Sequence, residues 1–351
     1  MNQDFANKLQ EFTVVYGTED FEKLLCERYR KYGVVVITGV HSEEYCNQKM
    51  DEIVQVFENL GTGIDRNKLE ETWTTYNLPP QTRPGMYQAL LANIQPVIDV
   101  RCHSKAKHIF QTLYNDLREN PVTDLVPTPD GINIKPNGVG PYNKLKSRDW
   151  PHLDQTIRNP FLCVQGQTVL TETSAAFRCT PKSHLLHSQI MDILEEIHKN
   201  LNPKSNWVKF DNNEINLIRD LCKAEDIDWQ IPIYSPKGSF IIWNSTTIHS
   251  AKLADGPEEK DPNDFWKGWR GVVYTCWRPK SEIPLRAQKL RKKYLEENRC
   301  TNHWGNKVFS KTPGGRYLYI EQRHPEIEKF LKIPSTVYNS IGYPDFPEEL
   351  I

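Results

Sequence analysis

One short segment restricts the possible folds of this chain more than any other: Asp149-Trp150-Pro151-His152-Leu153-Asp154-Gln155-Thr156. In an extended backbone, side chains at positions i and i+2 point to the same face, so the imidazole of His152 and the carboxylate of Asp154 can reach one point in space. Two protein ligands make a weak metal site. A third ligand is therefore expected from another part of the chain, brought to this segment by the fold.

The best candidate for the third ligand is His249, which ends the segment 237–250. Gly238 marks a turn, an apolar strand follows at 239–244, and the histidine comes near the far end. This order suits a buried strand that delivers a ligand to the mouth of a barrel. Two histidines and one carboxylate form the facial triad of non-haem Fe(II) oxygenases, which leaves metal positions open for cosubstrate and oxygen.

Composition limits the class of protein and its partners. The chain has 351 residues, of which 38% are hydrophobic and 25% charged, as in an ordinary globular protein with a sizeable core. A formal net charge of -1 gives no electrostatic reason to expect nucleic acid or an anionic membrane as a partner. The eight cysteines are scattered without a C-x-x-C pair, which predicts neither a zinc site nor a disulfide framework.

Targeting and membrane signals are not recognisable in the sequence. The first residues carry no basic region followed by an apolar one, and no uninterrupted apolar run reaches the roughly 18 residues of a membrane span. We therefore expect a cytoplasmic protein in a reducing compartment. The sequence does not specify an oligomeric state.

Hydrophobic spacing predicts the order of the elements. Helices are expected within 4–31, 42–60 and 93–117, in an insertion at 189–228, and from 281 onward, where the helix is basic and amphipathic. Strands are expected at 32–40, 132–135, 161–171, 174–180, 229–234, 239–244 and 269–277. Helices first and many short strands afterwards predict one domain over residues 1–351: a helical region to about 120, a barrel-like core at about 130–280 and an extension at 281–351.

An arginine has a specific use beside such a metal site. Arg270 opens the core strand that follows His249, and its planar guanidinium can bind a carboxylate with two hydrogen bonds. It would hold the distal carboxylate of 2-oxoglutarate. Arg278 has the same parity on an extended strand, so alternation does not separate the two, and Arg270 is preferred because it lies nearer the loop after His249.

Several polar and aromatic strand residues are further candidates for lining the pocket. Gln165 and Lys135 would orient the cosubstrate or substrate, although ordinary strand packing accounts for them equally well. The same applies to the remaining candidates, which are Asn133, Gln167, Trp150 and Trp243. Four other histidines are assigned no ligand role: His103 and His108 are expected on a solvated helix face, and His184 and His187 in a turn or at the rim.

These segments together resemble the phytanoyl-CoA dioxygenase (PhyH-like) family of Fe(II)/2-oxoglutarate-dependent oxygenases over about residues 30–280. The glycine-bounded strand at 33–40 and the helix start at 42–44 are similar to the family's opening, and His152-Leu153-Asp154 matches its H-x-D motif. Residues 177–184 resemble its P-G-S-H turn, with Lys182 in place of the usual glycine. Residues 238–249 match its glycine-strand-histidine segment, and Arg270 its cosubstrate arginine.

The resemblance implies a mainly β protein with flanking helices and a double-stranded β-helix (jelly-roll, cupin-like) core. It also implies Fe(II), 2-oxoglutarate and O2, release of succinate and CO2, and hydroxylation of an unidentified, small-molecule substrate. Related halogenases replace the ligand carboxylate by a small residue, so Asp154 favours hydroxylation. Two alternatives stay open: hydroxylation of a protein or peptide side chain on the same fold, and a non-catalytic jelly-roll binding protein.

Overall fold

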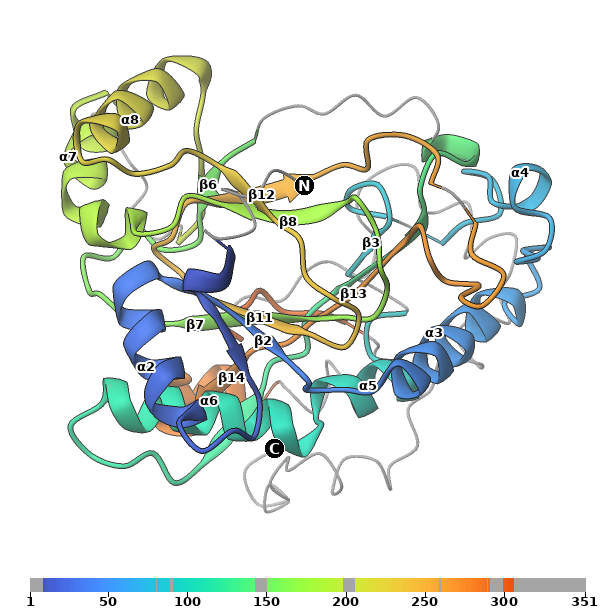
Figure 1. Ribbon diagram of the computed structural model, residues 1–351, viewed down its shortest axis with the longest axis horizontal. Helices are drawn as coiled ribbons and strands as arrows, with labels where there is room; N and C mark the ends of the chain where they lie inside the picture. Colours follow the sequence, from blue (N-terminus) through green and yellow to red (C-terminus); the bar gives the residue numbers. More distant parts are fainter. Residues whose placement is uncertain are drawn as a thin grey trace.

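The strands form two sheets that face each other (Figure 1). The structure, a computed structural model, describes residues 9–79, 81–88, 91–142, 150–197, 206–258, 260–288, 290 and 299–305. The larger sheet has, in spatial order, β1 (Thr13–Val15), β2 (Val34–Thr38), β11 (Phe240–Asn244), β7 (Val164–Val169), β13 (Trp269–Tyr274), β5 (Ile132–Pro136) and β3 (Met86–Tyr87). The smaller sheet has β10 (Ile231–Ile233), β8 (Ala176–Cys179), β12 (His249–Lys252), β6 (His152–Leu153) and β9 (Val208–Lys209). The expected jelly-roll core flanked by helices is confirmed.

Alternation along the strands of the larger sheet divides their side chains between two layers. In β13, Trp269 and Val273 belong to a hydrophobic core on the outer face of the sheet. Arg270 and Val272 instead line a cavity between the two sheets. The same parity carries into the neighbouring strand β5, where Lys135 lies directly opposite Arg270.

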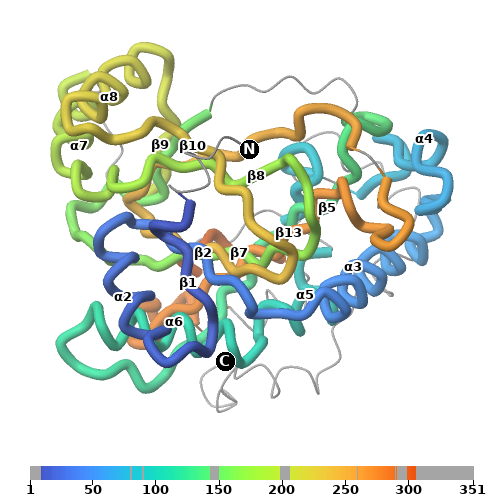
Figure 2. The backbone as a smooth tube through the Cα atoms, in the orientation of Figure 1, coloured from blue at the N-terminus to red at the C-terminus, as the bar shows by residue number. Residues whose placement is uncertain are grey.

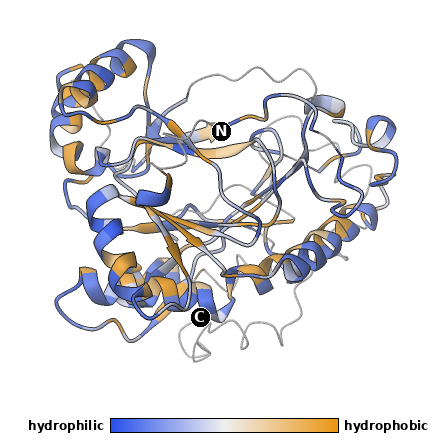
Figure 3. Ribbon diagram, viewed as in Figure 1, coloured by the Kyte–Doolittle hydropathy of each residue, from blue (hydrophilic) through white to orange (hydrophobic). Residues whose placement is uncertain are grey.

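Helices cover the outer face of the larger sheet, as Figures 1 and 2 show. They are α2 (Phe21–Tyr32), α3 (Glu43–Glu58), α5 (Gln95–Arg101) and α6 (Ser104–Leu117), with the short α4 (Leu69–Thr72) beyond them. Each long helix carries both hydrophobic and hydrophilic residues (Figure 3). Ser42 caps α3 as expected, because its hydroxyl accepts a hydrogen bond from the Tyr45 backbone N–H at 3.2 Å.

The insertion expected to be helical also contributes a strand. Helices α7 (His187–Ile197) and α8 (Asn212–Ala224) pack together at one end of the molecule (Figure 2). Between them, β9 adds to the edge of the smaller sheet and pairs with β6. The insertion therefore supports the strand that carries the H-x-D motif.

The stretch 4–31, where one or two helices were expected, contains a strand besides helix α2. Residues 13–15 form β1, which runs parallel to β2, because the β-branched Thr13, Val14 and Val15 suit a strand and Val14 is buried there. Residues 1–8 lie outside the described part of the chain.

The C-terminal extension, where a basic helix was expected from residue 281, begins with a tighter turn. A two-stranded sheet of β14 (Trp277–Pro279) and β4 (Leu125–Pro127) leads to the 3-10 turn η3 (Lys280–Glu282) and a helical turn at 285–288. Most of the expected basic helix, at 289 and 291–298, and the tail at 306–351 lie outside the described residues. Residues 299–305, here called the return segment, come back against the barrel. The expected division of the chain into regions stays a prediction.

Within the described residues, the helices are all too short or too polar to cross a membrane.

Candidate metal and cosubstrate site

The register of the smaller sheet brings the two expected histidine ligands together. His152 on β6 and His249 on β12 are directly paired across two antiparallel strands, and their ring centroids lie 4.1 Å apart. Asp154 follows His152 by two positions and points to the same place. Its Oδ2 lies 3.3 Å from His249 Nε2, and its Oδ1 lies 3.8 Å from His152 Nε2. One ligand atom from each residue falls within 4.8 Å of the other two.

Backbone carbonyls fix which nitrogen of each histidine is free. His152 Nδ1 lies 3.3 Å from the carbonyl oxygen of Trp150, and His249 Nδ1 lies 2.9 Å from that of Thr247. A carbonyl only accepts, so each Nδ1 carries the hydrogen and donates it. Both Nε2 lone pairs are therefore left for a metal, the arrangement usual in metal sites.

The electrostatics of the cluster favour the protonation states that metal ligands need. Burial, with the effect of the neighbouring His249, lowers the pKa of His152 to about 3. Burial by itself would raise the pKa of Asp154, but the surrounding imidazoles of His249, His303 and His152 hold that pKa well below its usual range. The cluster thus presents a neutral imidazole beside an ionised carboxylate, as metal binding requires.

Gln165 reaches this cluster from the opposite sheet. It stands on β7, and its side-chain Nε2 donates a hydrogen bond to Asp154 Oδ2 at 3.0 Å. Its Oε1 is buried and has no hydrogen-bond partner among the described residues. The structure therefore places Gln165 against a ligand carboxylate, with one acceptor still free to meet a bound molecule.

The two candidate arginines have different surroundings. Arg278 lies on β14, where its Nη2 pairs with Glu282 Oε2 at 2.9 Å and its guanidinium lies over the Trp304 ring. Arg270 is buried between the sheets, and within the described chain its Nε has no partner. Arg278 Nε and Nη1 are likewise buried without a partner among the described residues, so what separates the two arginines is position: Arg270 lines the cavity between the sheets, whereas Arg278 already pairs with a carboxylate on β14.

Lys135 adds a second buried cation beside Arg270. Its side chain is almost inaccessible, and its ammonium lies 5.5 Å from the centre of the Tyr142 ring. Burial, together with the charge of Arg270, lowers the pKa of Lys135 to about 8. Two adjacent buried cations without a carboxylate between them are costly, and an anionic ligand would offset that cost.

A cavity between the two sheets reaches a neighbour of His249. Arg270 and Phe177 both line it, and the Phe177 ring stacks against His249 at a centroid distance of 5.7 Å. On the other side of the cluster, the Trp150 ring lies parallel to His152 at 4.7 Å, and Trp243 lies 5.5 Å from His249. The expected aromatic walls are thus beside the ligands.

Unpaired polar atoms in this interior fit a polar ligand. Among the described residues, the inward-facing groups that are buried without a hydrogen-bond partner include Gln165 Oε1, Asn133 Oδ1, Trp243 Nε1 and Arg270 Nε. Leaving such groups unpaired is unfavourable. Two imidazoles and a carboxylate suit iron, and the cationic pair suits a dicarboxylate chelated to it, so the residues fit the implied cofactor and cosubstrate.

The remaining histidines make other contacts. His184 Nε2 and His187 Nε2 bind the backbone carbonyls of Arg30 and Gln155, at 2.9 Å and 2.8 Å. His103 accepts from a backbone N–H at the start of α6, and His108 pairs with Glu22 at the surface.

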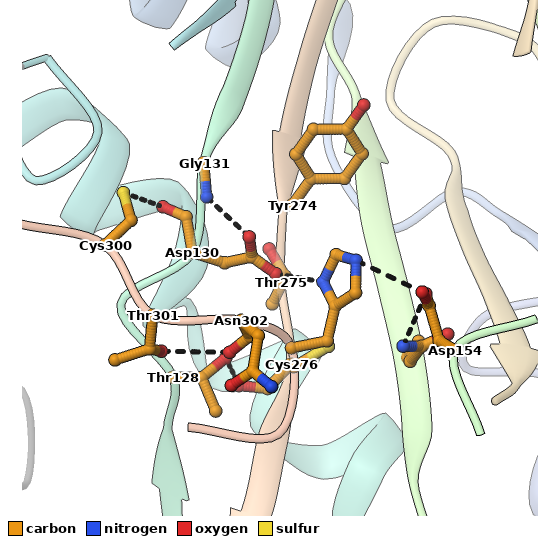
Figure 4. A network of polar contacts seen from close by, with 12 residues as sticks. Thr128, Asp130, Gly131, Asp154, Tyr274, Thr275, Cys276, Cys300, Thr301 and Asn302 are labelled. Atoms are coloured by element: carbon orange, nitrogen blue, oxygen red, sulfur yellow. Dashed lines mark hydrogen bonds and ion pairs between the residues drawn. The ribbon is translucent and has the colours of Figure 1, made fainter. Parts of the chain in front are cut away.

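Sequence reasoning missed the return segment. His303 lies at hydrogen-bonding distance of Asp130, and its Nε2 is 3.6 Å from Asp154 Oδ2. Trp304 Nε1 donates to the Asp154 carbonyl at 3.0 Å. Figure 4 shows the network from Asp130 to Asp154. No local motif surrounds His303 in the sequence, so only the folded chain reveals its place.

The fold and this cluster define a class. A jelly roll with two histidines and one aspartate converging on a buried point, beside a cavity with a free arginine, is a mononuclear non-haem metal enzyme scaffold.

Comparison with known proteins gives the family. The sequence pattern of the phytanoyl-CoA dioxygenase (PhyH) family matches residues 29–254, which is more than half of the chain. The chain belongs to this family, and with it to the iron- and 2-oxoglutarate-dependent oxygenase-like enzymes.

Individual relatives are distant. The chain is 22% identical to the "Ava biosynthesis cluster protein O" of Aspergillus versicolor over 296 residues, which cover 80% of this chain and 87% of that protein. Among solved structures, the hypothetical protein JW0805 of Escherichia coli superposes with a TM-score of 0.56 and 14% identity, covering 97% of this chain and 89% of that one. GIG2 of Candida albicans gives 0.55 and 12%, covering 98% and 84%. These structures support the fold alone.

Proposed function

We propose that this protein is a Fe(II)/2-oxoglutarate-dependent hydroxylase of a small molecule, with His152, Asp154 and His249 as the metal ligands. The observation that carries the proposal is that this cluster adjoins a cavity whose arginine, Arg270, has a buried nitrogen without a partner. Neither the cluster alone nor the cavity alone implies a 2-oxoglutarate-dependent reaction. Together they provide a metal position and an anchor for a dicarboxylate beside it.

The chain's own residues would bind and orient the cosubstrate. Arg270 would hold the distal carboxylate through two parallel hydrogen bonds, and Lys135 would add its positive charge at the same place. Gln165 would keep the Asp154 carboxylate in one orientation and offer its free Oε1 to the bound molecules. Bound iron would supply oxygen activation coupled to decarboxylation of 2-oxoglutarate.

Two observations support a small organic substrate. The ring of Trp150, stacked on His152, and the half-exposed Trp207, tilted toward the same histidine, form an aromatic surface beside the ligands. The relative from Aspergillus versicolor is named as a protein of a biosynthesis cluster. Aromatic walls bind the apolar surface of a small molecule at low entropic cost.

Anaerobic titration of the metal-free protein with Fe(II) and 2-oxoglutarate tests the proposal directly. We expect a weak visible charge-transfer band only when both are present, and no band with His152→Ala, because one of three ligands is gone. Under O2, succinate should form. A well-folded protein that binds neither component would overturn the proposal.

The two arginines give a matched comparison within the same titration. Arg270→Met should weaken 2-oxoglutarate binding by about 10-fold to 100-fold, since charge-assisted hydrogen bonds contribute about 1.5–3 kcal/mol. Arg278→Met should be less stable because it removes one of the two arginines that pair with Glu282, the other being Arg118, yet it should bind 2-oxoglutarate as the unaltered protein does. The reverse pattern would assign the cosubstrate to Arg278.

A further inference from the structure

The return segment (299–305) lies beyond the residues that match the family pattern, yet it touches a proposed metal ligand twice. Trp304 binds the backbone carbonyl of Asp154, and His303 approaches its carboxylate. Elsewhere, the segment is fixed by backbone bonding: the Thr301 N–H donates to the Pro129 carbonyl at 2.7 Å. His303 is therefore held in place by its neighbours on both sides.

Asp130 fixes the ring of His303 from behind. Asp130 is fully buried, accepts from the Gly131 N–H through Oδ1 at 2.6 Å, and binds His303 Nδ1 through Oδ2. The opposite nitrogen, Nε2, is thereby directed to Asp154. Figure 4 shows the carboxylates of Asp130 and Asp154 facing each other across this network. With Nδ1 bound by Asp130, the ring is held so that Nε2 points at the Asp154 carboxylate.

His303 approaches Asp154 from outside the ligand cluster. The donor atoms of His152, Asp154 and His249 form one group within 4.8 Å, whereas His303 groups with Asp130 and Cys276. His303 therefore contacts the carboxylate of a proposed ligand without being a ligand itself. A group in this position can orient the ligand.

The two oxygens of Asp154 have unequal surroundings. Oδ2 receives the Gln165 amide at 3.0 Å, lies 3.3 Å from His249 Nε2 and faces His303 Nε2 at 3.6 Å. Within the described chain, Oδ1 faces His152 Nε2, at 3.8 Å. The contacts of Gln165 and His303 on the same oxygen would fix the plane of the carboxylate between the two histidines.

We propose that His303, held by Asp130, is a positioning residue that orients Asp154 as a metal ligand, so that the C-terminal return segment completes a site whose ligands all come from the barrel. This inference rests on the proposed function, because it assumes that Asp154 binds a metal. It assigns His303 no contact with substrate.

Metal affinity of the whole protein tests the inference. In anaerobic Fe(II) titrations, His303→Ala should bind the metal about 10-fold to 100-fold more weakly, the usual effect of losing such an outer contact. His303→Gln, whose amide can still donate to Asp154, should lose less. Thr301→Val replaces a residue of the same segment by one of similar shape. This control variant should bind Fe(II) as tightly as the unaltered protein does.

A second pair of variants separates positioning from general packing. Asp130→Asn should weaken metal binding, and adding it to His303→Ala should cost nothing more, because Asp130 acts through His303. If His303→Ala does not fold, His303→Gln and Asp130→Asn decide the matter, with circular dichroism as the check on folding. If the losses of metal affinity in Asp130→Asn and His303→Ala add up in the double variant, Asp130 does not act through His303, and that part of the inference is overturned.

The outcomes distinguish this inference from the proposed function. If the unaltered protein binds no Fe(II), both the positioning role of His303 and the proposed function are overturned. Unaltered protein that binds Fe(II), with His303→Ala and His303→Gln binding equally well, would overturn the positioning role and leave the function standing. Two metal equivalents, one of them lost in Cys276→Ser, would make Asp130, Cys276 and His303 a second metal site and overturn the inference.

Discussion

At the scale of single residues, the barrel interior holds charge that the protein itself does not neutralise. Lys135 and Arg270 are direct cross-strand partners, both buried, and among the described residues neither forms an ion pair with a carboxylate. Side chains at such paired positions lie close together, so like charges repel. This arrangement lowers the stability of the empty protein and prepares it for an anion.

Replacing Lys135 by Met should therefore stabilise the empty protein while weakening its binding of 2-oxoglutarate. The pKa of Lys135 falls from 10.5 to about 8 on folding, and each unit corresponds to about 1.4 kcal/mol, so the gain at pH 7 is on the order of 3–4 kcal/mol. Urea unfolding and 2-oxoglutarate titration measure the two effects. Lys223→Met, at an exposed position, is the control.

The lowered pKa of Lys135 also determines how the stability of the protein depends on pH. Because the folded-state pKa is the lower one, the unfolded chain binds more protons between about pH 8 and pH 10.5. Lys135 therefore destabilises the folded protein fully below about pH 8, and this effect disappears as the pH rises from about 8 to 10.5. The stability advantage of Lys135→Met should therefore shrink between pH 8 and pH 10.5. An advantage that stays constant across this window would show that Lys135 is not the cause.

At the scale of elements, the turn before η2 (Ser183–Leu186) departs from the family pattern in a way that the backbone explains. The family has glycine where this chain has Lys182, and Lys182 adopts φ 67°, the left-handed conformation. Its N–H donates to the Tyr32 carbonyl at 2.7 Å, so the conformation is held by the strand and helix around it. A side chain with a Cβ is disfavoured there by roughly 1–2 kcal/mol.

Lys182→Gly should therefore stabilise the protein, by about 0.5–1 kcal/mol after the greater flexibility of glycine in the unfolded chain is subtracted. The denaturant midpoint should rise with an unchanged slope. Lys182→Ala, which keeps the Cβ and removes the rest of the side chain, should show no gain. A gain from alanine equal to that from glycine would mean that the lysine side chain, not the backbone, is unfavourable.

At the scale of the whole molecule, the site joins the two sheets. His152 and His249 come from the smaller sheet, and Gln165 and Arg270 come from the larger one. A metal with 2-oxoglutarate would be held from both sides, and the return segment would be held with them through His303. Binding at this point therefore stabilises the packing of the entire barrel.

Fe(II) with 2-oxoglutarate should raise the Tm under anaerobic conditions. At 100 times the dissociation constant the stabilisation is about 2.7 kcal/mol, or roughly 4 °C for a domain of this size. Removal of the metal by a chelator should return the Tm to its starting value, and His152→Ala should show no metal-dependent shift. An equal rise with 2-oxoglutarate alone would contradict binding through the metal.

Much of the site follows from the sequence because its geometry is local. The i, i+2 spacing of His152 and Asp154 fixes their common face in any extended backbone, and the apolar strand that ends near His249 indicates a buried ligand. Alternation likewise places Arg270 and Lys135 on inward faces. The jelly-roll core was expected through the family resemblance, which these motifs carried.

Tertiary structure decided the rest, because the remaining contacts join segments far apart in the chain. The register that sets His152 opposite His249, the Glu282 partner that occupies Arg278, and the β9 strand inside the insertion all depend on which strands pair. His303 reaches Asp154 from about 150 positions away. No local pattern encodes such a contact, since it arises only when the whole barrel has packed and the chain has closed against it.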